Sequence, residues 1–171
     1  MSENLYDDFR ITAMGLVVEV YAGLAARFAA QSEEHGLSAV EFEVLMRLAR
    51  SPRHELRMTD LSAQTSLSTS GVTRVVDRME RGGLLCRRAC PSDRRSAYAV
   101  VTDAGMSRLN ETLPGHIQLI QEWFVGQLDP DALQSLLDSL RIVRDAVHPG
   151  ATAGSAGGAA GVEVAADPSA A

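Results

Sequence analysis

The spacing of apolar residues predicts long amphipathic helices at both ends of the chain. Over residues 4–31, large apolar side chains recur every three, four or seven positions, as on one side of a helix. Near the other end, an Asp-Pro pair at 129–130 is typical of a helix start, because Asp caps the helix and Pro fits its first turn. The apolar side of this last helix consists of Leu133, Leu136, Leu137, Leu140, Val143 and Val147.

Shorter helices are predicted between these two. Ser38 and Glu41 have the spacing of a capping box, so a second helix is expected to begin there. Thr59 can cap a short third helix, and residues 68–81 form a fourth that ends at a Gly-Gly pair. A short helix, a turn and another helix are the outline of a helix-turn-helix.

Strand-like runs follow the fourth helix. Residues 84–89 and 97–101 are predicted to be strands, joined by a polar and basic turn at 91–95. Thr102 can then cap a long fifth helix, which is expected to kink at Pro114 because proline removes a backbone hydrogen bond.

This order of elements predicts a mainly α-helical fold with a winged helix-turn-helix core at about residues 55–101. The helices at about 4–31 and 103–147 are expected to form a dimerisation region, because their apolar sides need partners that the small core barely supplies. Residues 1–147 then make one domain. The Ala- and Gly-rich sequence over 148–171 has no apolar period, so a disordered tail is expected.

Charge is segregated along the chain. The 171 residues carry a net charge of −6. Between residues 53 and 96, however, nine arginines accompany five acidic residues, whereas the rest has seven arginines and seventeen acidic residues. A basic module within an acidic protein predicts one surface for a polyanion such as double-stranded DNA.

The predicted fourth helix has two chemically different sides. Val72, Val75, Val76 and Met79 have the spacing of a core-facing stripe, while the first turn is small and polar and can enter the major groove. Any surface helix can carry arginines, so the order of elements is what favours DNA binding. The predicted DNA contacts are Ser68, Thr69, Ser70, Thr73, Arg74 and Arg78 on this helix, with Arg87, Arg94 and Arg95 in the wing.

Other classes of function compete with DNA binding. A winged helix can also serve as a protein-interaction module without specific DNA binding. An enzyme is not predicted, because the sequence lacks GxSxG, Walker and HExxH motifs and any metal-spaced Cys/His cluster, and we expect no cofactor or metal. No run reaches the roughly 18 apolar residues of a membrane span, so a cytoplasmic protein with no membrane partner is expected.

The two cysteines, Cys86 and Cys90, fall in one predicted strand. Their Cα atoms would then be about 13 Å apart, too far for a disulfide. Ordinary strand cysteines are the favoured interpretation, and a single reactive thiol or an intersubunit bridge stays open.

The central segment resembles the winged-helix core of the MarR family of bacterial transcription regulators. The resemblance is carried by residues 72–101, VTRVVDRMERGGLLCRRACPSDRRSAYAVV, and by the helix start TDAG that follows. In helix order it extends over about residues 5–147. It implies a homodimer whose terminal helices interlock, with recognition helices in consecutive major grooves of a pseudo-palindromic operator.

The resemblance also implies roles for particular residues. Asp77 matches an acid that can pair with Arg95 and orient the wing. Asp93, two residues before Arg95, is the second residue predicted to orient the wing. A ligand-responsive repressor is implied, which answers small aromatic or anionic effectors. Candidate pocket residues are Tyr21, Arg27, Arg47 and His116, each of which is also an ordinary surface or packing residue; candidate dimer-interface residues are Leu5, Phe9, Leu133, Leu136, Leu137 and Leu140.

Overall fold

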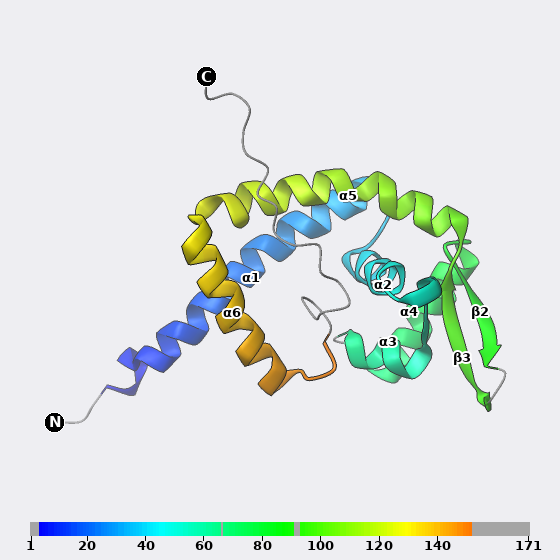
Figure 1. The fold of residues 1–171 in the computed structure, drawn as a ribbon, viewed down its shortest axis with the longest axis horizontal. Helices are drawn as coiled ribbons and strands as arrows, with labels where there is room; N and C mark the ends of the chain where they lie inside the picture. Colours follow the sequence, from blue (N-terminus) through cyan, green and yellow to red (C-terminus); the bar gives the residue numbers. More distant parts are fainter. Residues whose placement is uncertain (1–3, 66, 91–92, 152–171) are drawn as a thin grey trace, which may run out of the picture.

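The computed structural model describes residues 4–65, 67–90 and 93–151, with the backbone alone at residues 93–95 (Figure 1). Its α-helices are α1 (Phe9–Glu34), α2 (Ala39–Ala49), α3 (Met58–Gln64), α4 (Thr69–Arg81), α5 (Asp103–Trp123) and α6 (Pro130–Val147), and short 3-10 turns lie at Leu5–Asp7, Pro52–His54 and Val125–Gln127. Its strands are β1 (Glu55–Arg57), β2 (Leu85–Cys90) and β3 (Asp93–Val101). The tail predicted over 148–171 lies outside the described residues from residue 152 onward.

The described chain has a winged part and a part made of long helices. In Figure 1, α2, α3, α4 and the strands gather at one end of α5, while α1 and α6 cross in this view toward the opposite end. The strands form an antiparallel sheet in the order β1-β3-β2. The mainly helical arrangement predicted from the apolar spacing is therefore observed, with a small sheet.

The core of the winged part is built around α4. The predicted stripe of Val72, Val75, Val76 and Met79 is buried, together with Leu45 and Leu48 of α2, Leu61 of α3, Leu85 of β2 and Ala99 of β3. Burial of these side chains orients α4, because the opposite side of the helix is left in solvent.

Most of the predicted helix starts are confirmed by side-chain caps. The Ser38–Glu41 capping box is present at α2, Ser68 accepts from the backbone N–H of Gly71 at α4, and Asp129 caps α6. α1 begins at Phe9 rather than near residue 4, because Asp8 caps it. Pro114 lies inside α5 and does not end it.

The start of α3 was predicted incorrectly. Thr59 lies inside the helix, whose N-cap is Arg57 without a side-chain hydrogen bond. The reason is β1, a three-residue strand that pairs with β3 and runs directly into α3. A strand this short gives no clear apolar alternation, so the sequence did not predict it. β3 also begins at Asp93, within the segment predicted to be a turn.

The N-terminal part of α1 has little cover within the chain. Phe9, its first residue, is 78% exposed, and Leu5, in a short 3-10 turn before the helix, is 73% exposed, whereas the buried residues of α1 are Gln31 and Ser32 near its other end. On α6, Leu140 is 42% exposed but Leu133 is already buried within the subunit.

The expectation that no segment could span a membrane needs a correction. By length and composition α1 could do so, since its most apolar 18-residue window has a mean hydropathy of 1.4 and at most two charged residues. The longest uninterrupted apolar run is too short to reveal it, because Glu19 and Arg27 interrupt the apolar and alanine-rich middle of the helix. A helix that packs against protein can have the same composition.

The end of α6 returns to the winged part. His148 Nε2 lies 3.0 Å from the carbonyl oxygen of Ala63 at the end of α3, and Gly150 lies against the same carbonyl. The long helices therefore contact the helix-turn-helix at a point far in sequence from the junction of β3 and α5.

Gly105 allows the first turn of α5 to pack closely on the start of the wing. A Cβ at this position would lie 2.1 Å from the carbonyl oxygen of Leu84 and 3.0 Å from Val101 Cγ1. The Leu84 carbonyl is backbone and accepts from the Thr102 N–H, so it cannot easily move aside.

We predict that Gly105→Ala destabilises the protein by about 1–3 kcal/mol, the usual cost of overpacking. The free energy of unfolding from urea titration measures this change. Gly82→Ala is the matched control, because Gly82 has helical dihedrals and a Cβ there would meet only ordinary contacts from 3.5 Å. Equal stability of the two variants would contradict the close packing at Gly105.

Candidate DNA-binding surface

The first turn of α4 presents a cluster of small polar groups. Ser68, Thr69 and Ser70 are exposed, and Ser68 Oγ accepts from the Gly71 backbone N–H at 3.1 Å while lying 3.2 Å from Ser70 Oγ. One turn later Thr73 is also exposed, with its hydroxyl donating to the Thr69 carbonyl at 3.0 Å. These residues come together because the buried valines of α4 force the polar side outward.

Arg74 stands out among the predicted arginine contacts. Its side chain is exposed, and within the described part of the chain no ion pair or hydrogen bond engages it. A guanidinium held near a polar helix start, with all its donors available, can form a bidentate contact with a base edge or a phosphate.

Two other predicted contacts, Arg78 and Arg87, are engaged by acidic residues. Arg78 Nε donates to Glu41 Oε1 of α2 at 2.6 Å. Arg87 of β2 lies 2.6 Å from Asp77 and 2.6 Å from Glu80, both on α4. Arg87 faces α4 because it lies two residues after the buried Leu85, on the same face of β2, and it thereby joins the wing to the recognition helix.

The expected partner of Asp77 was Arg95, and here Asp77 pairs with Arg87. The side chains of Asp93, Arg94 and Arg95 lie outside the described residues, so their predicted roles stay predictions. Arg87 therefore pairs with Asp77, the acidic residue that the family resemblance implies orients the wing.

A second arginine cluster, which the sequence did not predict, lies on the outer face of the sheet. Arg57 of β1 and Arg88 of β2 both lie opposite Tyr98 of β3, with guanidinium carbons 5.7 Å and 4.8 Å from its ring centroid. Arg88 also pairs with the buried Glu55 at 2.5 Å. The bond from Arg88 holds the pKa of the Glu55 carboxyl below its ordinary value. The three side chains share one face of the sheet because side chains alternate along paired strands. The sequence did not predict β1, so it could not predict that Arg57 lies beside Tyr98.

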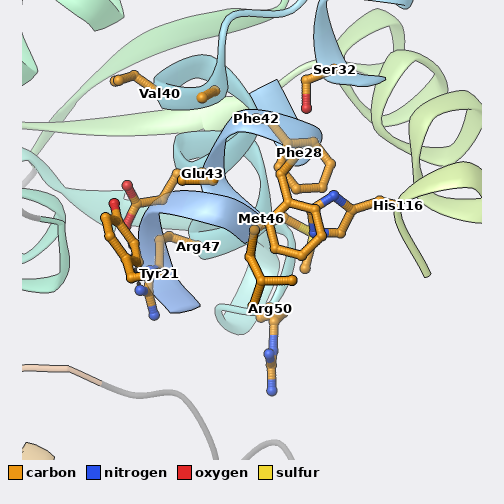
Figure 2. Close-up of a pocket in the computed structure, with 13 residues that line it drawn as sticks. Tyr21, Phe28, Ser32, Val40, Phe42, Glu43, Met46, Arg47, Arg50 and His116 are labelled. Atoms are coloured by element: carbon orange, nitrogen blue, oxygen red, sulfur yellow. Dashed lines mark hydrogen bonds and ion pairs between the residues drawn. The ribbon is translucent and has the colours of Figure 1, made fainter. Parts of the chain in front are cut away.

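A mostly apolar pocket lies between α1, α2 and α5. It has a volume of about 480 Å³, and three of the four predicted pocket residues, Tyr21, Arg47 and His116, line it (Figure 2). Arg27 does not, because its guanidinium stacks 4.1 Å from the ring centroid of Trp123.

His116 is the central polar group of this pocket. Its ring lies 4.5 Å from Phe28 and 4.4 Å from Phe42, measured between centroids. Burial lowers its pKa, and its Nδ1 is buried without a hydrogen-bond partner among the described residues. Arg47 and Arg50 lie at the same pocket, and Arg47 is 3.4 Å from Glu43. Aromatic walls with a neutral imidazole and nearby cations suit a planar molecule that carries a negative charge.

Cys86 and Cys90 are both in β2, as predicted, and neither forms a disulfide. Cys86 is exposed and Cys90 is buried.

Comparison with known proteins identifies the family of this fold. A family model described as MarR family matches residues 35–96. The uncharacterized HTH-type transcriptional regulator YkoM of Bacillus subtilis is 37% identical over 111 residues, covering 64% of this chain and 70% of YkoM. The chain belongs to the MarR family.

Further relatives are consistent with this assignment. The HTH-type transcriptional repressor YetL of Bacillus subtilis is 33% identical over 116 residues, covering 64% of this chain and 70% of YetL. Sco3205 of Streptomyces coelicolor, a MarR family transcriptional regulator solved in complex with DNA, is 32% identical with a TM-score of 0.76, over 81% of this chain and 87% of that one. This MarR-family protein is therefore a DNA-binding transcription regulator with a winged helix fold, and such regulators are not enzymes.

Proposed function

We propose that this MarR-family protein is a homodimeric repressor that binds a pseudo-palindromic operator and releases it when a small aromatic acid binds. The observation that carries the DNA part is α4, whose apolar side is buried while Ser68, Thr69, Ser70, Thr73 and Arg74 are exposed. The similarity to YetL, a transcriptional repressor, supports repression rather than activation.

Each DNA half-site would be read by one α4 and one wing. The first turn of α4 enters the major groove, where hydroxyls and backbone N–H groups reach phosphates and Arg74 reaches a base edge. Arg94 and Arg95 at the wing contact the adjacent minor groove, with Asp93 orienting them. A wing fixed to α4 through Arg87 keeps the two contacts at a constant distance.

We predict that Arg74→Ala weakens operator binding by roughly 1–3 kcal/mol and relaxes the preference at one base position. Titration of DNA from the protein's own promoter region, with single-base variants, measures both effects. Arg141→Ala, which removes a partly exposed arginine of α6, is the matched control and should bind as the wild type does. Should the sequence preference survive in Arg74→Ala, Arg74 contacts a phosphate instead.

Dimerisation is supported by the uncovered apolar side chains of α1, of the short turn before it and of α6. Leu5, Phe9, Leu136, Leu137 and Leu140 are exposed or half-buried in the single chain, and Leu133 anchors α6 beneath them. A second copy would cover this surface, and two-fold symmetry also matches an operator with two half-sites. A bilayer suits α1 less well, because its C-terminal end is fixed in the protein core, where Gln31 Nε2 donates to the Thr112 carbonyl. A soluble, cytoplasmic dimer is the proposed state.

The double variant Phe9→Glu/Leu140→Glu is expected to be largely monomeric, because it places charges in the apolar contact. Sedimentation velocity measures the change, and operator affinity should fall with it. Arg74→Ala serves as the reciprocal control, since it should remain dimeric while losing DNA affinity. A dimeric Phe9→Glu/Leu140→Glu protein would contradict this interface.

The effector proposal rests on the pocket between α1, α2 and α5. We predict that hydroxybenzoates raise the melting temperature and weaken operator binding, because a flat ring fits beside Phe28 and His116 while the carboxylate meets Arg47 or Arg50. Benzyl alcohol, which lacks the charge, is the matched control compound. If no aromatic acid shifts the melting temperature, this class of effector is wrong, whereas the DNA-binding proposal is unaffected.

A further inference from the structure

Helix α2 belongs both to the effector pocket and to the support of the recognition helix. Ala39, Val40 and Glu43, in its first turns, line the pocket. Glu41 lies among them in sequence but points to α4, where it meets Arg78. One helical turn therefore contacts the pocket on one side and the DNA-reading helix on the other.

The contact between Glu41 and Arg78 is built from several hydrogen bonds. Arg78 Nε donates to Glu41 Oε1 at 2.6 Å, and its Nη2 lies 3.4 Å from Ser38 Oγ. The other carboxylate oxygen, Oε2, accepts from the Ser38 backbone N–H at 2.9 Å and from its hydroxyl at 2.7 Å. Both oxygens of Glu41 are thus used, one by the cap of α2 and one by α4.

The Glu41 carboxylate is well placed to act as a fixed anchor. Its side chain is only 13% exposed. Burial raises its pKa, but the bonds from Ser38 and Arg78 outweigh burial and lower the pKa below its ordinary value. A charged, largely buried carboxylate that accepts from both Ser38 and Arg78 cannot shift without breaking a charge-assisted hydrogen bond.

Arg78 lies one turn after Arg74 on α4, so the two arginines lie on neighbouring positions of the same helix face. Their environments differ, since Arg74 has no partner among the described residues while the Arg78 guanidinium is turned toward α2. Arg78 therefore uses N–H donors of its guanidinium in bonds to α2 and its N-cap, whereas Arg74 keeps all of its donors available for DNA.

We infer that Arg78 is a positioning residue for DNA reading rather than a DNA contact. Its ion pair with Glu41 fixes the recognition helix to the first turn of α2, so a molecule that enters the pocket and displaces α2 also displaces α4. This inference rests on the proposed function, because it assigns the path by which the pocket controls the operator-binding helix. The apolar packing between α2 and α4 holds the helices together, and the ion pair fixes their relative position along the contact.

The first test uses Glu41→Gln, Arg78→Ala and the double variant. Gln can keep the capping box, so α2 should still form, and thermal unfolding checks this. Each variant should weaken operator binding about tenfold, a typical coupling between sites, and the double variant should be no weaker than either single one. The slope of log affinity against log salt should stay at the wild-type value in all three.

The alternative that Arg78 contacts a phosphate gives opposite results. Arg78→Ala would then lower the salt slope by about 0.9 for each phosphate that the arginine neutralises, whereas Glu41→Gln would free Arg78 and leave binding unchanged or tighter. Either result overturns the inference. Arg81→Ala is the matched control on α4, because Arg81 is exposed and its Nε donates to the Asp77 carbonyl of its own helix.

A second test fills the pocket with a larger side chain in place of the unidentified effector. Ala25 of α1 lines the pocket, so Ala25→Phe partly fills it. In the wild-type background Ala25→Phe should weaken operator binding several-fold, and in the Glu41→Gln/Arg78→Ala background it should add little. Equal effects in both backgrounds, or no effect in the wild type, would show that the ion pair does not carry the coupling. Failure of the wild-type protein to bind any promoter DNA would instead refute the proposed function itself.

Discussion

The burial of one side of α4 is the constraint on which the rest of this structure depends. Val72, Val76 and Met79 are almost completely removed from solvent, so the helix has a single orientation in the core. The polar first turn is left on the surface as a consequence, and so is Arg74. The acidic residues of α4 then fall where β2 can reach them through Arg87, which attaches the wing to the same helix.

Neutralisation by acidic residues separates the arginines of the winged part into groups with different roles. Arg87, Arg88 and Arg78 each meet a carboxylate and hold two elements together. Arg74 meets none among the described residues. A protein with net negative charge can thus keep a DNA-binding surface. Some arginines of its basic module form ion pairs within the protein, and others stay available to DNA.

The sequence predicted those features that depend on local periodicity and capping. The buried stripe of α4, the Ser38–Glu41 capping box and the Asp129 cap all follow from neighbours within one or two turns. Pairings between distant segments were not predictable in this way. The contact of Arg78 with Glu41 spans 37 residues, and that of Arg88 with Glu55 spans 33, so neither leaves a local signal. For the same reason β1 was missed and the cap of α3 was placed at Thr59.

The return of α6 to α3 has a mechanical consequence. Besides the packing of α2 against α1 and α5, the winged part is joined to the long helices by two chain connections, the turn after α1 and the junction of β3 with α5, and by the hydrogen bond of His148 with the Ala63 carbonyl. A hydrogen bond of this kind has a net worth of about 1 kcal/mol, whereas the two chain connections are covalent. A change in the orientation of the winged part would therefore break the contact between the end of α6 and α3 at little cost, while the turn after α1 and the start of α5 would act as its hinges.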